Sequence, residues 1–261
     1  MHTNSYRRKT QRTPPKTYYT VEYEHIPYGH TQSRIERAVY FQLESAQEAM
    51  MKMIKRGQVV TGLNEHNYFK HFIYTTQAFT KEQCEYQIQR FEEDTTHQTV
   101  DYSHHNDTQW KNYTSIYITK HQHWWDIDKL YANTTDRLLR EYIKHCELVL
   151  DDCNPRPVMF KSNTYNDTGF KLRRYDPGDY FHWHHDLTNK DEGELGWRHI
   201  GCIFYLNDVA EGGETEFLDG TLVKPTQGTV LMFPSSWTYV HRGLSPVNQP
   251  KYAATTFICS N

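Results

Sequence analysis

The pattern of apolar and polar positions separates a short N-terminal part of the chain from a larger remainder. Residues 17–60 contain two alternating runs, "TYYTVEYEH" and "RAVYFQLES", and then a helical run, "SAQEAMMKMIKRG". In the helical run, Met50, Met53 and Ile54 form one apolar face. A period of two is typical of strands, and a period of about 3.6 is typical of helices. These runs predict a small ββα appendage over 17–60, which is too short to bury a large core of its own.

Two longer helices are predicted in the middle of the chain. The run "FTKEQCEYQIQRFEED" begins with a capping box, Thr80 and Gln83, and predicts a helix over 80–94. The run "WWDIDKLYANTTDRLLREYIKHCELVL" carries an apolar stripe and predicts a helix over 126–150. Between them, "NYTSIYIT" alternates like a strand. We expect these elements to belong to a larger domain over 66–261.

The texture of the chain changes after Pro157. Short alternating or apolar runs such as "FKLRRY", "HIGCIFYL", "GTVLMFP" and "YAATTFI" recur there, separated by Gly, Pro, Asp and Asn. Short strands at such spacing predict a β-sandwich or a barrel. The expected fold is therefore mainly β with supporting helices (α+β).

Charge and cysteine content limit the partners and the compartment. The 261 residues carry a formal net charge of −3, which gives no bulk attraction to nucleic acid or to an anionic membrane. No apolar run approaches the roughly 20 residues that span a bilayer. Residues 1–16 are basic and polar and predict a flexible arm, favoured as a solvated tail over a nucleic-acid-binding one; they lack the apolar segment of a secretory signal. Five cysteines without a CxxC spacing are typical of reduced thiols, so we expect a cytoplasmic protein.

Histidines and carboxylates concentrate in the stretch "RRYDPGDYFHWHHDLTN". Side chains two positions apart in an extended chain point the same way, so His184 and Asp186 share one face and His185 faces the other. A second histidine, His241, follows the later strand "TVLMFP". Two imidazoles and one carboxylate would fill one face of an octahedral metal and leave three positions open, as in non-heme Fe(II) oxygenases. A cupin-like pair of His182 and His184 around another metal is the alternative.

A lysine near these candidate ligands could bind a negatively charged co-substrate. Lys251 lies ten residues after His241, on the next predicted strand. A cation there could pair with the distal carboxylate of a dicarboxylic co-substrate whose other end chelates the metal. For a lysine taken alone, the alternative is an ordinary surface position on a strand.

Four pieces of sequence together resemble a known family. "RRYDPGDYFHWHHD", "FYLNDVAEGGETEF", "VKPTQGTVLMFP" and "HRGLSPVNQPKY" are similar to motifs of the Fe(II)- and 2-oxoglutarate-dependent dioxygenases, specifically of their prolyl 4-hydroxylase-like branch. The resemblance covers about 165–258 and does not extend to 17–60. It implies a double-stranded β-helix core (jelly-roll, cupin-like) over about 158–259.

The resemblance also implies roles for individual residues. His184, Asp186 and His241 would be the iron ligands. Lys251 would bind the C5 carboxylate of 2-oxoglutarate, and the hydroxyl of Tyr175 would donate a hydrogen bond to the same carboxylate.

Further candidate residues for the site are chosen because they lie close to these positions in the sequence. Thr255, on the strand of Lys251, is a further candidate contact for 2-oxoglutarate. Phe257 stands six residues after the lysine, where prolyl hydroxylases often carry a tryptophan; the missing indole N–H bears on the prolyl substrate rather than on the iron chemistry. Candidates for the mouth of the substrate site flank the ligands in sequence, with ordinary packing as the alternative for each: Trp183, Arg198, Trp237, Tyr239 and Arg242.

The implied activity is hydroxylation of a C–H bond with release of succinate and CO2. Prolyl residues of a peptide or protein are the leading substrate, and the reaction would use Fe(II), 2-oxoglutarate and O2, with ascorbate in support. A second hypothesis is hydroxylation of a free amino acid, another small molecule or a different residue type. A third is a binding protein that keeps the fold without turnover, and the complete set of ligand positions argues against it.

Overall fold

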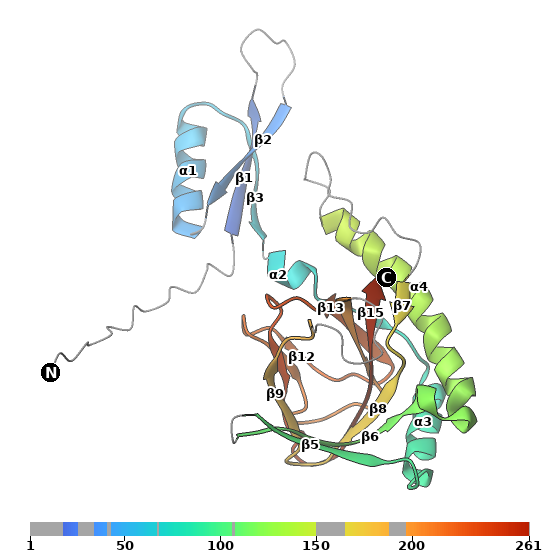
Figure 1. The fold of residues 1–261 in the computed structure, drawn as a ribbon. Coiled ribbons are helices and arrows are strands. Elements are labelled where there is room, and N and C mark those ends of the chain that lie inside the picture. Colours follow the sequence, from blue (N-terminus) through green and yellow to red (C-terminus); the bar gives the residue numbers. More distant parts are fainter. Residues whose placement is uncertain are drawn as a thin grey trace, which may run out of the picture. The chain divides into compact units, whose positions relative to one another are not determined.

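The computed structural model describes residues 18–25, 34–40, 43–66, 68–105, 108–149, 165–187 and 197–260. The chain divides into two compact units, residues 1–70 and residues 71–261, whose elements are drawn in Figure 1. The predicted arm at 1–16 and the beginning of the predicted jelly-roll core, up to residue 164, lie outside the described residues.

The first unit is a three-stranded antiparallel sheet with one helix. Its elements are β1 (Tyr18–His25), β2 (Arg34–Tyr40), α1 (Leu43–Lys55) and β3 (Val60–His66). The strand order is β2-β1-β3, and α1 contacts all three strands. The strand β3 adds a third strand to the ββα appendage that the sequence predicts over 17–60. Its run "VTGLNEH" contains a glycine and little apolar alternation, so pairing with β1, rather than a sequence pattern, defines it.

The second unit is built on one large antiparallel sheet. Its strand order is β12-β11-β14-β9-β6-β8-β15-β10-β13-β4, with β5 paired to β6 and β7 paired to β15. The strands are β4 (Tyr74–Gln77), β5 (Thr99–His105), β6 (Thr108–Tyr117), β7 (Tyr165–Asp167), β8 (Lys171–Tyr175), β9 (Tyr180–His184), β10 (Trp197–Tyr205), β11 (Thr215–Phe217), β12 (Leu222–Val223), β13 (Thr229–Pro234), β14 (His241–Gly243) and β15 (Lys251–Ser260).

The sheet curls into a half-barrel, and the helices α3 (Lys81–Glu93) and α4 (Trp125–Val149) lie along one side of it (Figure 1). Two short 3-10 turns, η1 (Ile118–Lys120) and η2 (Gln122–Trp124), precede α4 in the chain, and the short helix α2 (Tyr68–His71) spans the boundary between the two units in the sequence. This arrangement confirms the predicted fold class, a mainly β protein with supporting helices. The helices α3 and α4 begin and end within one residue of the predicted ranges 80–94 and 126–150.

A single core joins the helices to the convex side of the sheet. The N-terminus of α3 has the capping box expected from the sequence: the backbone N–H of Gln83 donates to Thr80 Oγ1 (3.3 Å), and the backbone N–H of Thr80 donates to Gln83 Oε1 (2.9 Å). The largest buried side chains of the core come from both layers: Phe79, Phe91, Trp124, Tyr131, Tyr142, Phe170 and Phe204. With α3 and α4 packed against the outside of the sheet, the cavity described below is lined by residues of its strands.

Cysteines and membrane segments give two further findings. Cys84, Cys146, Cys202 and Cys259 are buried and form no disulfide with one another, while Cys153 lies outside the described residues. Among the residues that the structure describes, no helix has the length and apolar character needed to cross a membrane.

Candidate metal centre

The three predicted ligands come together where two neighbouring strands meet. His184 ends β9, Asp186 follows two residues later, and His241 begins β14. The strands β9 and β14 pair antiparallel with His184 directly opposite His241. As a result, the Asp186 carboxylate lies between the two imidazoles, with Oδ1 3.5 Å from His184 Nε2 and Oδ2 3.5 Å from His241 Nε2.

This donor set fits a single metal ion. Metal–nitrogen and metal–oxygen bonds of about 2.1 Å place neighbouring ligand atoms about 3 Å apart, close to the measured separations. The rings are oriented from behind: His184 Nδ1 lies 2.7 Å from the carbonyl oxygen of His182, and His241 Nδ1 lies 3.0 Å from that of Tyr239. A ring that donates through Nδ1–H keeps its Nε2 lone pair for the metal.

The environment keeps His184 in the form that can bind a metal. Burial and the neighbouring His241 lower the pKa of His184 to about 3, so its imidazole is neutral. The alternative ligand His182 contributes its carbonyl to the orientation of His184, and its own ring packs edge-on against Tyr180. His185 is exposed at the rim of the cavity.

Aromatic rings and one glycine complete the packing of the ligands. Phe181 stacks on the His184 ring with centroids 3.7 Å apart, and Phe233 meets the His241 ring edge-on at 4.7 Å. Behind the carboxylate lies Gly201 of β10. A Cβ atom at this position would lie 2.9 Å from the Phe233 ring and 3.1 Å from Asp186 Oδ2. The glycine therefore leaves the space that Asp186 and Phe233 occupy.

A cavity of about 380 Å³ opens in front of the three ligands. Lys251 of β15 and Tyr175 of β8 lie opposite each other in register and line it, as does Thr255, which is also buried. Lys251 Nζ donates to the carbonyl oxygen of Gly213 at 2.8 Å and lies 5.0 Å from the centre of the Tyr175 ring. Burial, with repulsion from the nearby Arg173, lowers the pKa of Lys251 to about 8.

Arg173 is a cavity residue that the sequence analysis did not single out. It precedes Tyr175 by two positions in β8, so both side chains share a face with Lys171. The Arg173 guanidinium interacts with the Tyr175 hydroxyl and lies 4.9 Å from the centre of the Tyr113 ring. Its Nε atom is buried and has no hydrogen-bond partner within the described parts of the chain. The alternation in "KLRRY" is the signal that could have found it.

Of the five candidates for the mouth of the substrate site, one lines the cavity. Arg198 lines the cavity, with its guanidinium 4.0 Å from the centre of the Phe257 ring. The other four are not among the lining residues. Arg242 pairs with Glu216 at 2.6 Å and covers the Trp183 ring, Trp237 is largely exposed, and Tyr239 is buried. Lining residues that the sequence analysis missed include Trp110, Lys111, Tyr113, Lys171 and Arg173.

A family model matches the part of the chain that contains this site. Residues 170–259 match the model of the 2OG-Fe(II) oxygenase superfamily. The matched residues are those of a 2OG-Fe(II) oxygenase-like domain. The resemblance seen in the sequence motifs is thereby confirmed, and the three ligand candidates, Lys251 and Tyr175 all lie within the matched residues.

Solved structures are similar to this chain in fold. A prolyl hydroxylase from Trichoplax adhaerens, in complex with a hypoxia inducible factor oxygen degradation domain peptide fragment, is 16% identical with a TM-score of 0.52, covering 72% of this chain and 84% of that one. A 2OG-Fe(II) oxygenase family oxidoreductase from Burkholderia pseudomallei is 12% identical with a TM-score of 0.50, covering 74% and 89%.

A viral collagen prolyl hydroxylase from Paramecium Bursaria Chlorella virus-1 is 18% identical with a TM-score of 0.49, covering 73% and 96%. No curated protein sequence matches this chain significantly. At these identities the likeness concerns the fold, and it confirms the expected jelly-roll core.

Proposed function

We propose that this oxygenase hydroxylates prolyl residues of a peptide or protein, with Fe(II), 2-oxoglutarate and O2, and releases succinate and CO2. The observation that carries the proposal is the convergence of His184, Asp186 and His241 at a cavity that also holds a buried lysine. Each part of the proposal rests on a different group of side chains around this cavity.

Fe(II) is assigned to the two histidines and the aspartate. Their Nε2 atoms and carboxylate oxygens are spaced for one ion, and an imidazole–carboxylate set with free positions suits non-heme iron. When bound there, Fe(II) supplies O2 activation, in which one oxygen atom enters succinate and the other enters the hydroxylated product. The protein holds the ligands in place through the carbonyls behind His184 and His241 and through the packing of Phe181 and Phe233.

2-Oxoglutarate is assigned to the cationic end of the cavity. Lys251 is buried, and a buried ammonium group is costly without a counter-ion. Its hydrogen bond goes to a neutral carbonyl, and Arg173 beside it offers a buried Nε–H without a partner among the described residues. Burial raises the pKa of Tyr175, so its hydroxyl remains a hydrogen-bond donor. These three groups would bind the C5 carboxylate, with Thr255 on the same strand as a further contact.

The prolyl substrate is supported by the aromatic part of the cavity. Trp110 meets the Phe181 ring edge-on at 5.4 Å and the His184 ring at 6.2 Å, so an indole lies beside a proposed iron ligand. Phe257 lines the cavity near Arg198. Flat aromatic faces suit a pyrrolidine ring. The Trichoplax adhaerens structure, a prolyl hydroxylase with a peptide fragment, makes a peptidyl substrate the leading choice.

A small acidic molecule is the second candidate substrate. The cavity is lined by Lys111, Lys171 and Arg198 in addition to the two cations assigned to 2-oxoglutarate. Asp101 neutralises part of this charge, since it lies 2.7 Å from Lys171 and 3.8 Å from Lys111. The remaining positive charge favours a substrate with a carboxylate, such as a free amino acid or an acidic peptide.

The test is a direct assay with matched peptides. The protein, with Fe(II), 2-oxoglutarate and ascorbate, is incubated with a proline-rich peptide and with the same peptide carrying alanine in place of proline. The proposal predicts that only the proline-containing peptide gains the mass of one oxygen atom, and that succinate forms in proportion to this gain. The Asp186→Ala protein should form neither the modified peptide nor succinate. Stimulation of succinate formation by free acidic amino acids but by neither peptide would favour the second candidate. The assay is repeated without ascorbate, since its supporting role is part of the proposal.

A cytoplasmic location is part of the proposal as well. Cys84, Cys146 and Cys202 form no disulfide within the described part of the chain, which is the state expected in a reducing compartment.

A further inference from the structure

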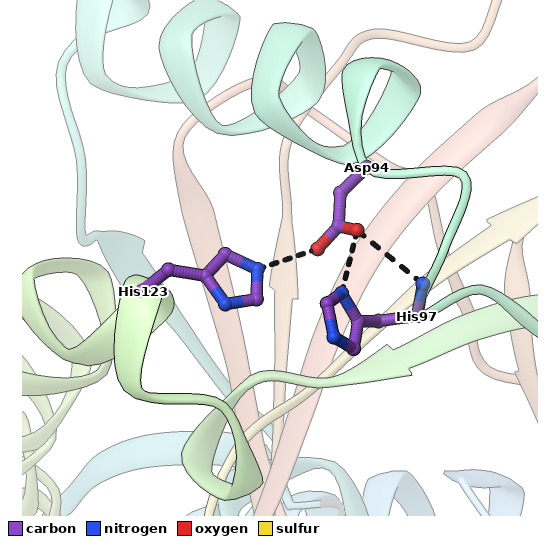
Figure 2. A group of neighbouring side chains, drawn as sticks. All are labelled: Asp94, His97 and His123. Carbon is purple, nitrogen blue, oxygen red and sulfur yellow. Dashed lines mark hydrogen bonds and ion pairs between the residues drawn. The ribbon is translucent and has the colours of Figure 1, made fainter.

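A second group of histidines with one carboxylate lies outside the cavity. Asp94 caps the C-terminus of α3, His97 follows in the connection to β5, and His123 lies in η2, just before α4. Figure 2 shows the two rings approaching the carboxylate from different sides. His97 Nδ1 lies 2.7 Å from Asp94 Oδ1, and His123 Nε2 lies 2.8 Å from Asp94 Oδ2. None of the three residues lines the cavity of the first centre.

We propose that Asp94, His97 and His123 form a second metal site, which binds a divalent ion of the zinc type and ties the end of α3 to the start of α4. The three ligand atoms lie within 4.8 Å of one another. Zinc bonds to imidazole nitrogen and carboxylate oxygen are about 2.0–2.2 Å long, which in a tetrahedral site places neighbouring ligand atoms about 3.4 Å apart. The measured nitrogen–oxygen separations of 2.7 and 2.8 Å are hydrogen-bond distances, and side-chain movements of less than about 1 Å would widen them to this value.

The carboxylate is held in the orientation that a ligand needs. Trp124 Nε1–H donates to Asp94 Oδ2 at 2.7 Å, and the Asp94 side chain is only 13% exposed. The backbone N–H of His97 donates to the other oxygen at 3.3 Å. Hydrogen bonds of this kind to a ligating carboxylate fix its direction and raise metal affinity. The carboxylate is therefore held in a fixed orientation before an ion binds.

Arg90 of α3 braces the other side of the site. It donates to the backbone carbonyl of His123, lies 4.5 Å from the centre of the Trp124 ring, and forms two hydrogen bonds with Asp126 at 2.8 and 2.7 Å. These contacts position η2 against the end of α3. The pairing with Asp126 also neutralises Arg90, so its charge does not oppose a bound cation.

An ion can reach this site from solvent. The His123 side chain is 47% exposed, which leaves room for water molecules at the remaining coordination positions. The ring of His121 lies 4.2 Å from that of His97, so a third imidazole is in the immediate surroundings. Zinc accepts such mixed nitrogen and oxygen sets, and binding requires that both ring nitrogens give up the protons they would share with Asp94.

The alternative is a purely hydrogen-bonded cluster, in which Asp94 accepts from both rings and no metal binds. A titration with Co²⁺ distinguishes a metal site from a hydrogen-bonded cluster, because Co²⁺ absorbs visible light when nitrogen and oxygen atoms coordinate it. The titration uses the full chain carrying Asp186→Ala, so that the first centre does not contribute. We expect binding of about one equivalent of Co²⁺ and its displacement by Zn²⁺.

Two further variants assign that binding to the cluster. His123→Gln and His97→Gln, each added to Asp186→Ala, should weaken Co²⁺ binding by roughly tenfold or more. His145→Gln serves as the matched control, because this histidine lies in α4 against Tyr74 and outside the cluster. Circular dichroism confirms that each variant is folded.

Stability and activity give independent readouts. Zn²⁺ should raise the melting temperature of the Asp186→Ala protein but not that of the His123→Gln double variant. In the otherwise wild-type chain, His123→Gln should leave 2-oxoglutarate turnover unchanged. The proposal is overturned if the folded Asp186→Ala protein binds no Co²⁺, or if the glutamine variants bind it as well as the His145→Gln control does.

Discussion

The position of the Asp186 carboxylate depends on a neighbouring residue that has no side chain. Gly201 faces Asp186 and Phe233 so closely that even a methyl group would have to displace one of them. Overpacking of this kind costs about 1–3 kcal/mol and shifts the groups around it. Because Phe233 packs against His241, such a shift would disturb two of the three proposed ligands together.

Gly201→Ala should therefore weaken metal binding by roughly tenfold or more, since ligands held out of place lose affinity. Equilibrium dialysis with Mn²⁺ measures this without turnover. The control is Gly243→Ala, where a Cβ atom would have no contact closer than 3.7 Å. Equal Mn²⁺ affinities for the two variants would show that Gly201 does not position the carboxylate.

A second prediction concerns the charge of Lys251, whose pKa burial lowers to about 8. Only the protonated lysine attracts a carboxylate, so the affinity for 2-oxoglutarate should be constant below this pKa and fall above it. One pH unit above this pKa the dissociation constant should be about tenfold higher than its constant value at low pH, as long as the lysine of the complex keeps its proton. Calorimetric titration of the Mn²⁺-loaded protein measures the change.

Lys251→Arg provides the control, because a guanidinium stays charged throughout this range. Its dissociation constant should stay constant from pH 7 to about pH 9. If both proteins lost affinity in parallel, the titrating group would be another one, and Lys251 would not be the co-substrate cation.

For individual residues, the sequence predicts the ligand set but not the direction of every neighbouring side chain. The motif order placed His184, Asp186 and His241 together, and the structure brings them together. Trp183 and Arg242 were chosen as neighbours of ligands, yet consecutive strand residues point to opposite faces. They accordingly meet each other, 4.5 Å from guanidinium to ring centre.

At the scale of elements, α3 depends on its N-terminal cap. Thr80→Ala removes the hydroxyl that accepts from Gln83 and should lower the free energy of unfolding by about 1 kcal/mol. Thr80→Ser keeps the hydroxyl and should lose much less. All six tryptophans lie in the second unit, so their fluorescence during urea unfolding reports this unit alone. Equal losses for both variants would mean that the methyl group, not the cap, stabilises the helix.

Helices and strands differed in how well their patterns predicted them. The apolar stripes and the cap of α3 and α4 arise from local sequence, and their bounds were predicted to within one residue. The strand β3 carries no such signal, because its place is set by backbone pairing with β1. Arg173 and Lys251 approach each other only because β8 and β15 are neighbours in the sheet, which no single segment reveals.

At the scale of the whole molecule, the proposed active site belongs to one unit. Every residue of the metal centre and the cavity lies within residues 71–261. A chain that begins at Tyr68 should therefore bind Mn²⁺ and 2-oxoglutarate with unchanged affinity, since a compact unit with its own core can fold alone. If this shorter chain folded but lost either ligand, the first unit would contribute to the site.

The central claim is that this chain couples oxidation of 2-oxoglutarate to hydroxylation at a site held by His184, Asp186 and His241. The most direct measurement is succinate formation by the wild-type protein and by Asp186→Ala, with and without added Fe(II). The account predicts succinate only from the wild-type protein with Fe(II) and 2-oxoglutarate. Equal succinate formation by a folded Asp186→Ala protein would contradict it.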